Sequence, residues 1–136
     1  MVKKYSELYR DTRKALLPID GPHQAGATAR ELRVLASGKS AAELLADGEK
    51  YADTSGQTAL EAYVERMEKG EPLAYILGEW ECYGLKLFVT PDVLIPRDDT
   101  CARAEIAIRQ ALFLVPNPRI LDLCTGCGCI CIAIAS

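Results

Sequence analysis

The segment 119–136 constrains the fold of this chain more than any other part of the sequence. It starts with a short apolar run, residues 120–123, which predicts a buried β-strand. A loop containing Gly126 and Gly128 follows, and the apolar residues after that loop predict a helix. A strand that turns through a glycine-rich loop into a helix is how α/β proteins offer backbone N–H groups to a nucleotide-like ligand. We therefore predict that an α/β domain starts in this part of the chain.

The overall composition is that of a soluble globular protein. Hydrophobic residues make up 49% of the 136 residues and charged residues 26%. The formal net charge of −3 supplies no basic field that would attract nucleic acid or an anionic membrane, so we expect no direct partner of either kind. We see no apolar run typical of a signal peptide or a membrane span, and we expect a cytoplasmic protein.

The sequence contains six cysteines, and four of them lie close together at positions 124, 127, 129 and 131. In a secreted chain an even number would suggest disulfides, but the reducing cytosol favours free thiols. A thiolate metal site is the alternative. Positions two apart on a helix face different directions, and no second cysteine pair or nearby histidine completes a tetrahedral set. We therefore predict no metal site, and small buried apolar side chains in its place.

Residues 1–79 are predicted to form an all-α helical bundle. A first helix is expected to end near a breaker-rich stretch, residues 18–22, which predicts a loop. A second helix is expected over residues 25–36, with Gly38 in the position of a C-terminal cap.

Two capping-box patterns predict further helix starts in this bundle. Ser40 and Thr58 are each followed three residues later by a glutamate, and the second of these helices is expected to end at Gly70. A proline then precedes a short predicted helix over residues 73–77.

The residue pattern changes after this bundle. Residues 80–83 and 85–89, joined around a glycine, predict a β-hairpin, and residues 80–92 are interpreted as a linker. Capping groups at residues 98–100 predict a helix as far as about residue 114, broken by prolines at 116 and 118. Residues 93–136 are then interpreted as the truncated start of an α/β domain, so the expected fold class is α+β with several domains.

The loop motif resembles a known cofactor-binding motif. Its residues Asp-Leu-Cys-Thr-Gly-Cys-Gly, at 122–128, are similar to the first motif of the S-adenosylmethionine-dependent methyltransferases. Cys131 stands where the dinucleotide-binding pattern would have a third glycine, so that pattern does not fit. The resemblance implies a Rossmann-like fold and S-adenosylmethionine as cofactor.

Earlier segments narrow this resemblance. Residues 71–79, 83–84, 89–97 and 119–123 closely resemble, in order and spacing, the protein-(glutamine-N5) methyltransferases that modify peptide chain release factors. The resemblance extends more loosely over the helical N-terminus. It implies methyl transfer from S-adenosylmethionine to the glutamine of the Gly-Gly-Gln motif of class 1 release factors. It also implies that the helical domain 1–79 helps to hold the release factor, in an enzyme that we expect to be monomeric at full length.

Site residues follow from the same resemblance by position. The residues expected to bind or cover the cofactor are Asp122, Cys124, Thr125, Gly126, Cys127 and Gly128 in the loop, with Pro96, Arg97 and Thr100 in the covering segment. Cys124 replaces a glycine that is usual in the family, which places a side chain and a backbone restriction in the loop.

The resemblance also assigns an Asn-Pro-Pro-Tyr motif that orients the reacting glutamine, and this motif does not occur in the sequence. Asn117 and Pro118 precede the predicted strand and are no substitute. We therefore assign no catalytic residue, and we expect the N-terminal portion of a longer enzyme, inactive alone. Two alternatives stay open: a glutamine methyltransferase acting on a ribosomal protein, and a protein-binding module without catalysis.

Overall fold

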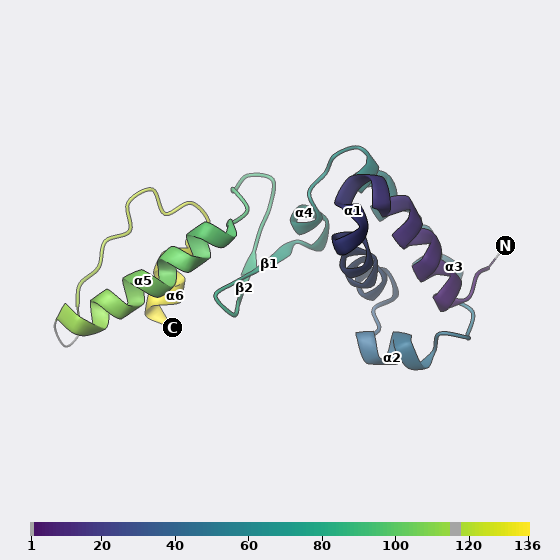
Figure 1. Ribbon diagram of the computed structural model, residues 1–136, viewed down its shortest axis with the longest axis horizontal. Coiled ribbons are helices and arrows are strands. Elements are labelled where there is room, and N and C mark those ends of the chain that lie inside the picture. Colours follow the sequence, from purple (N-terminus) through teal and green to yellow (C-terminus); the bar gives the residue numbers. More distant parts are fainter. Residues whose placement is uncertain (1, 115–117) are drawn as a thin grey trace. The chain divides into compact units, whose positions relative to one another are not determined.

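The computed structural model describes residues 2–114 and 118–136, so the part of the break predicted at residues 116–118 that precedes Pro118 lies outside the described residues. The chain divides into two compact units, Met1–Leu77 and Gly78–Ser136 (Figure 1). The first is helical, and the second contains a hairpin and two helices. Within the described part, no helix is long and apolar enough to cross a membrane.

The first unit starts with α1, Tyr5–Ser37, which is divided by one non-helical residue. Gly21 has φ 72° and ψ 174°, a conformation that glycine adopts far more readily than other residues. The break predicted over residues 18–22 is therefore confirmed, but it is narrower than expected. At the other end, Gly38 has φ 66° and donates its N–H to the carbonyl of Val34, as predicted for a C-terminal cap.

The short helix α2, Ala41–Ala46, starts at the predicted capping box. The Ser40 hydroxyl accepts a hydrogen bond from the Glu43 N–H at 3.2 Å, and the Ser40 N–H donates to the Glu43 carboxylate at 2.8 Å. The N–H groups of Ser40 and Glu43 have no backbone partner at the start of a helix, and the two side chains supply one for each. This is why the four-residue pattern predicts a helix start.

The predicted start of the next helix at Thr58 is wrong, because α3 spans Thr54–Glu68. Its N-cap is Asp53, whose carboxylate accepts a hydrogen bond from the Gly56 N–H at 2.8 Å. Thr58 lies inside the helix, where its hydroxyl donates to the Thr54 carbonyl at 2.9 Å. The earlier aspartate offers the stronger cap, so the helix starts five residues sooner than an N-cap at Thr58 would place it.

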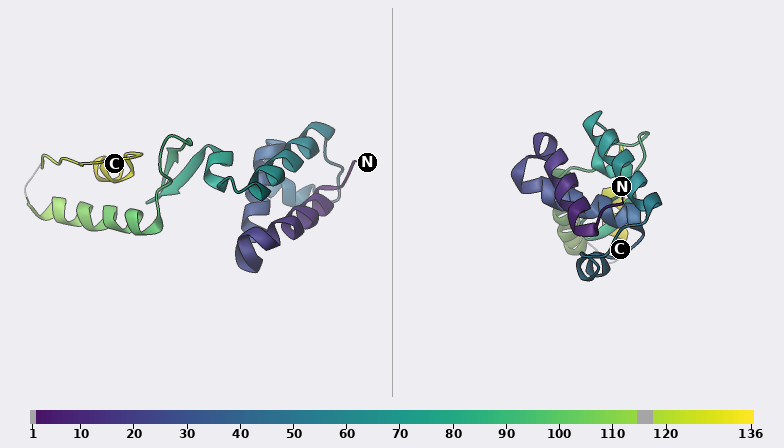
Figure 2. Two further views of the ribbon diagram at one scale, coloured as in Figure 1. Left: turned by 90° about the horizontal axis from the view of Figure 1, so that it is seen from above. Right: turned by 90° about the vertical axis from the view of Figure 1, so that its right-hand side faces the viewer.

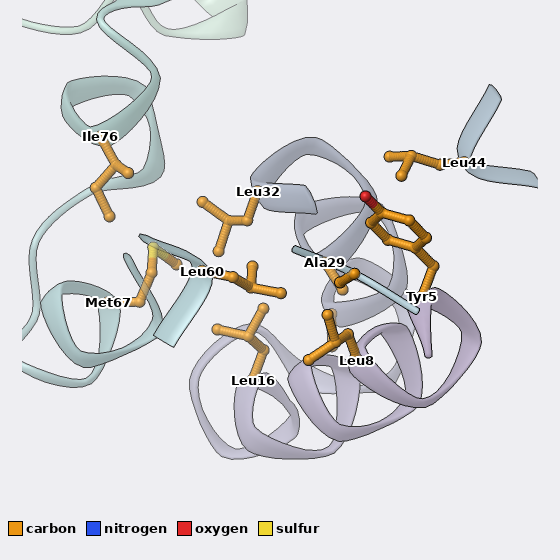
Figure 3. Packing of buried hydrophobic residues seen from close by; sticks show 11 residues of the cluster. Tyr5, Leu8, Leu16, Ala29, Leu32, Leu44, Leu60, Met67 and Ile76 are labelled. Carbon is orange, nitrogen blue, oxygen red and sulfur yellow. The ribbon is translucent and has the colours of Figure 1, made fainter. Parts of the chain in front are cut away.

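The hydrophobic core of this unit lies between α1 and α3, with contributions from α2 and from α4, Leu73–Leu77, which forms as predicted (Figure 3). Leu16 and Leu32 are fully buried. The buried members of the core are Tyr5, Leu8, Leu16, Ala25, Ala29, Leu32, Leu44, Ala52, Leu60, Met67 and Ile76.

The second unit starts with the predicted hairpin. Strands β1, Glu79–Cys82, and β2, Leu85–Phe88, pair antiparallel with Trp80 opposite Leu87. Tyr83 and Gly84 form the turn with φ values of 54° and 73°. Positive φ at both central residues is what a type I′ hairpin turn requires.

Helix α5, Asp98–Leu114, follows as predicted, and α6, Cys129–Ala135, lies beside it (Figure 2). The predicted strand over residues 120–123 is wrong, since this segment has no strand structure and Leu121 and Leu123 are 79% and 76% exposed. A strand of this kind needs hydrogen-bonded neighbours, and the sheet of the described residues consists of β1 and β2 alone. The described residues are therefore mostly helical with one small antiparallel sheet, which fits the predicted N-terminal helical domain but does not confirm a Rossmann-like start.

Candidate functional site

The loop before α6 is organised by two short hydrogen bonds. The Thr125 hydroxyl donates to the Asp122 carboxylate at 2.9 Å, and the Gly128 N–H donates to the Thr125 carbonyl at 2.9 Å. Asp122 therefore helps to order the loop. Loop residues 124–126 are exposed to solvent.

The two glycines of the loop are required by their backbone conformation. Gly126 has φ 59° and Gly128 has φ 78°, both in the left-handed region that favours glycine. A Cβ atom at Gly126 would meet nothing within 4 Å, whereas at Gly128 it would lie 3.4 Å from Cδ1 of Ile132. The backbone at Gly126 is thus accessible, with open space on the side where a Cβ atom would lie.

Cys124 shares this left-handed conformation, with φ 60°, although it is not a glycine. Such a conformation costs a residue with a side chain roughly 1–2 kcal/mol. The backbone restriction expected at this position is therefore real, and the glycine usual in the family would relieve it.

The three residues predicted to cover the cofactor lie just before and within the first turn of α5. Pro96 is buried, Thr100 is half-buried and Arg97 is exposed. The Arg97 carbonyl accepts hydrogen bonds from the N–H groups of Thr100 and Cys101, at 2.8 and 3.1 Å. Among the residues that the structure describes, the Arg97 guanidinium takes part in no ion pair, so it is available to a ligand.

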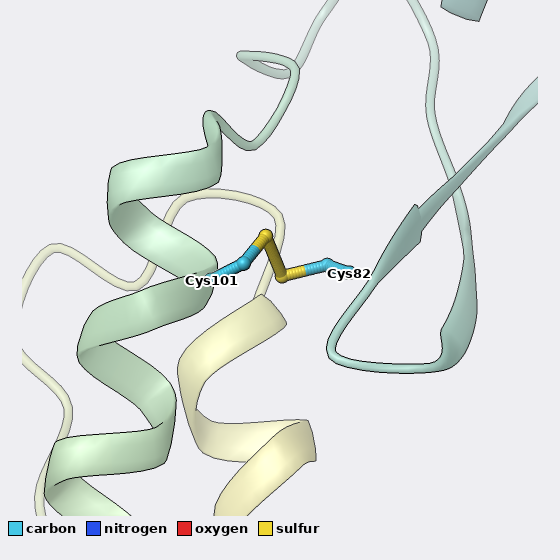
Figure 4. Close-up of a disulfide and its surroundings, with 2 residues drawn as sticks. All are labelled: Cys82 and Cys101. Atoms are coloured by element: carbon cyan, nitrogen blue, oxygen red, sulfur yellow. A yellow bond between two sulfur atoms is a disulfide. The ribbon is translucent and has the colours of Figure 1, made fainter.

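A cluster of cysteines connects this covering segment with the loop. Cys82 of β1 and Cys101 of α5 form a disulfide with 5.5 Å between their Cα atoms (Figure 4). Cys129 of α6 is buried against Cys82, and Cys101 and Cys127 pack on the same cluster. The start of α5 and the loop end at Cys127 are therefore neighbours.

The expectation of free thiols is wrong for Cys82 and Cys101. That expectation rested on the redox compartment alone. The disulfide depends on how β1 and α5 pack. Its two cysteines lie 19 residues apart in sequence, so no local sequence pattern predicts the bond. The remaining cysteines, Cys124, Cys127, Cys129 and Cys131, are free.

One of the free cysteines, Cys129, has a perturbed thiol. Burial, followed by a hydrogen bond with Cys127, raises the pKa of Cys129 to about 11. A metal ligand must be a thiolate, and a buried thiol with a raised pKa resists that change. Among the described residues, no group of three or more histidine, cysteine, aspartate or glutamate side chains is placed to hold a metal ion.

The first unit contains a cavity that the sequence patterns did not predict. It has a volume of about 480 Å³ and is lined by both halves of α1, by α2 and by the turn after it, including Tyr9, Arg33 and Leu45. These residues are far apart in sequence, and Tyr9 meets Arg33 only because α1 reverses direction at Gly21. In the sequence, the arginines at positions 30 and 33 of the predicted helix 25–36 are the available signal.

Comparison with known proteins identifies similar sequences for both units. Residues 7–78 match the family described as PrmC N-terminal domain. A release factor glutamine methyltransferase of Coxiella burnetii is 48% identical over 100 residues, covering 71% of this chain and 35% of that protein. Proteins of the same description from Haemophilus influenzae and Escherichia coli are 47% and 41% identical, covering 74% of this chain in each case and 36% and 35% of their own lengths. The chain thus spans about a third of the length of these relatives.

Proposed function

The chain belongs to the PrmC N-terminal domain family, and on that premise we propose that it is the part of a release factor glutamine methyltransferase that holds the protein substrate and contributes to the cofactor site. The observation that carries this proposal is the continuous similarity to relatives with that description, which extends over both structural units. Residues 1–79 would form the substrate-recognition domain, residues 80–92 the linker, and residues 93–136 the start of the methyltransferase domain.

The proposed reaction transfers a methyl group from S-adenosylmethionine to the side-chain amide nitrogen of the glutamine in a Gly-Gly-Gln motif. An amide nitrogen is a weak nucleophile because its lone pair is delocalised into the carbonyl group. Catalysis therefore depends on holding the amide in line with the methyl group. The Asn-Pro-Pro-Tyr motif that would do so is absent from the 136 residues, which supports an assignment without catalytic residues and without activity of this chain alone.

For the cofactor, we propose that the loop 122–128 and the segment around Pro96, Arg97 and Thr100 hold S-adenosylmethionine. When bound, the cofactor supplies an electrophilic methyl group on its sulfonium. The support lies in the exposed loop backbone and in the open space at Gly126. Further support comes from Cys101 and Cys127, which pack on one cluster, so that the start of α5 and the loop are neighbours.

Calorimetric titration of the chain with S-adenosylmethionine tests the cofactor site. Gly126→Val should abolish cofactor binding by filling the loop. Gly70→Val is a matched control, because Gly70 also has a positive φ, 88°, and open space around it, but lies in the other unit. Equal cofactor affinities of the two variants would contradict the assignment of the loop.

A second titration, with a class 1 release factor, tests the substrate. We expect the factor to bind, and we expect no methyl transfer when cofactor and factor are both present. Methyl transfer by these 136 residues would overturn the proposed inactivity. Binding of a ribosomal protein in place of the release factor would favour that alternative substrate, and binding of the factor without any cofactor affinity would favour a non-catalytic binding module.

A further inference from the structure

The cavity in the first unit lies between the two halves of α1 and the short helix α2. Tyr9 lines it from the first half, Arg30, Arg33 and Val34 from the second, and Leu45 from α2. Its volume of about 480 Å³ is in the range of sites that bury a ligand or a peptide side chain.

The wall of this cavity carries two arginines, Arg30 and Arg33. The Arg33 guanidinium lies over the ring of Tyr9, 5.2 Å from its centroid, and burial lowers the pKa of Arg33. Within the described part of the chain, the Arg33 Nε atom is buried without a hydrogen-bond partner. Neither Arg30 nor Arg33 belongs to an ion pair between residues 2–114 and 118–136. A partly desolvated cation without a counter-ion is costly, and an arriving anion would remove that cost.

The carboxylate that lines the same cavity is already engaged elsewhere. Glu49 accepts a hydrogen bond from the Lys4 ammonium at 2.9 Å and one from the Ser6 hydroxyl at 3.4 Å. Its charge is therefore compensated by Lys4, and it leaves the two arginines unpaired. The net charge presented by the cavity wall is positive.

The remaining wall is apolar and partly uncovered. Leu44 is buried, but the neighbouring Leu45 is 85% exposed although it lines the cavity. An exposed leucine beside a cavity offers an apolar contact to a bound chain. Apolar surface next to a fixed guanidinium selects a ligand that carries both an apolar group and a carboxylate.

We propose that this cavity binds an acidic peptide segment of a partner protein, with an apolar side chain against Leu45 and a carboxylate on Arg30 and Arg33. Arginine suits this role because its planar guanidinium donates two parallel hydrogen bonds to one carboxylate. The cavity lies in the unit proposed above to hold the protein substrate, and its binding of a peptide requires neither cofactor nor methyl transfer, so it can be tested separately.

The test measures fluorescence anisotropy of a short labelled peptide of alternating leucine and glutamate, titrated with the whole chain. The same peptide with glutamine in place of glutamate should bind at least tenfold more weakly, as expected for loss of charge-assisted hydrogen bonds. Affinity for the acidic peptide should fall as salt is added, because the contact is partly exposed. Equal binding of the two peptides would overturn the proposal.

Variants locate the binding. Arg33→Gln should weaken binding of the acidic peptide about tenfold. Lys14→Gln removes the same charge from an exposed position of α1 outside the cavity and should change it less than about twofold. Leu45→Ser provides a second variant that does not endanger folding, since this side chain is exposed, and should also weaken binding.

Equal affinities of the Arg33 and Lys14 variants would overturn the proposal, as would binding of free decanoate in preference to the peptide. Because the probe is synthetic, its failure leaves release-factor binding untouched. Failure of the release-factor titration, in turn, leaves the peptide result standing.

Discussion

Cys82 of β1 and Cys101 in the first turn of α5 are covalently joined, and their disulfide ties the hairpin to the helix beside the proposed cofactor loop (Figure 4). Cys129 of α6 is buried against Cys82. The organisation of the second unit therefore depends on a cross-link between residues that belong to different elements.

Reduction of this disulfide is expected to destabilise the second unit. Closing a loop of this length restricts the unfolded chain, an effect worth about 3 kcal/mol. Trp80 is the single tryptophan and lies on β1, so its fluorescence during denaturant unfolding reports on this unit. The untreated chain should unfold at higher denaturant concentration than the reduced chain or the Cys82→Ser variant. Cys124→Ser, which leaves the disulfide intact, is the control, and an equal midpoint for all four samples would contradict the prediction.

The free thiols should differ in their rates of alkylation near pH 8. Burial and the hydrogen bond with Cys127 raise the pKa of Cys129 from 9.0 to about 11, so this thiol remains protonated and unreactive. Cys124 and Cys131 are exposed and should react first. Mass spectrometry of iodoacetamide-treated peptides measures the order, with the denatured chain as control for intrinsic reactivity. Early modification of Cys129 in the folded chain would speak against its burial.

The same raised pKa predicts a dependence of stability on pH. Below pH 9 the Cys129 thiol is protonated in both the folded and the unfolded chain, so its contribution to stability is fully present. Between pH 9 and about 11 the unfolded chain loses this proton more readily, and the folded state should lose stability as pH rises. Cys129→Ala should flatten this part of the profile relative to Cys131→Ala, as followed by Trp80 fluorescence. Equal slopes for the two variants would contradict the assignment.

The helical unit should be sensitive to truncation of Leu32. This side chain is fully buried, and Leu32→Ala is expected to reduce the free energy of unfolding by about 2–5 kcal/mol through lost contacts and a cavity. Leu45→Ala removes the same atoms from a position that is 85% exposed and should change it by no more than about 0.5 kcal/mol. Unfolding followed by far-ultraviolet circular dichroism measures both. Similar losses for the two variants would be inconsistent with the core described above.

A side chain at Gly21 should disturb the reversal of α1. With φ 72° and ψ 174°, this position is nearly closed to other residues, and Gly21→Ala is expected to cost about 1–3 kcal/mol. A steric clash is not the cause of this expected loss of stability, since nothing lies within 4 Å of the added Cβ. Gly48→Ala is the matched control, because its backbone has no positive φ and its nearest neighbour is an ordinary contact at 3.5 Å. Thermal unfolding of both variants gives the comparison, and an unaffected Gly21→Ala would remove the conformational argument.

Cys124→Gly should act in the opposite direction. Glycine tolerates the φ of 60° at this position, so the substitution should relieve a strain of roughly 1 kcal/mol, partly offset by the entropy of glycine in the unfolded chain. On the proposed function, it should also tighten binding of S-adenosylmethionine in calorimetric titration. Tyr83→Gly relieves a similar positive φ of 54° in the hairpin, outside the loop, and serves as control. Weaker cofactor binding by the glycine variant would count against the assigned loop.

Features decided within a few residues could be predicted from the sequence. The cap at Gly38, the capping box at Ser40, the hairpin turn and the helix from Asp98 all form, because each depends on hydrogen bonds and φ values of neighbouring residues. The glycine-rich loop could also be recognised from the sequence, because its motif consists of neighbouring residues. Even so, Thr58 shows that two local caps can compete, and the aspartate at position 53 prevails.

What only the tertiary structure decided involves partners that are distant in sequence. An apolar run such as residues 120–123 becomes a strand only beside another strand, and the hairpin does not provide one. Cys82 pairs with Cys101 because β1 packs near α5, and Arg33 meets Tyr9 because α1 reverses at Gly21. Local sequence sets the backbone angles and caps of each element, whereas the free energy of burial and pairing depends on which elements meet, and that is settled only when the chain packs.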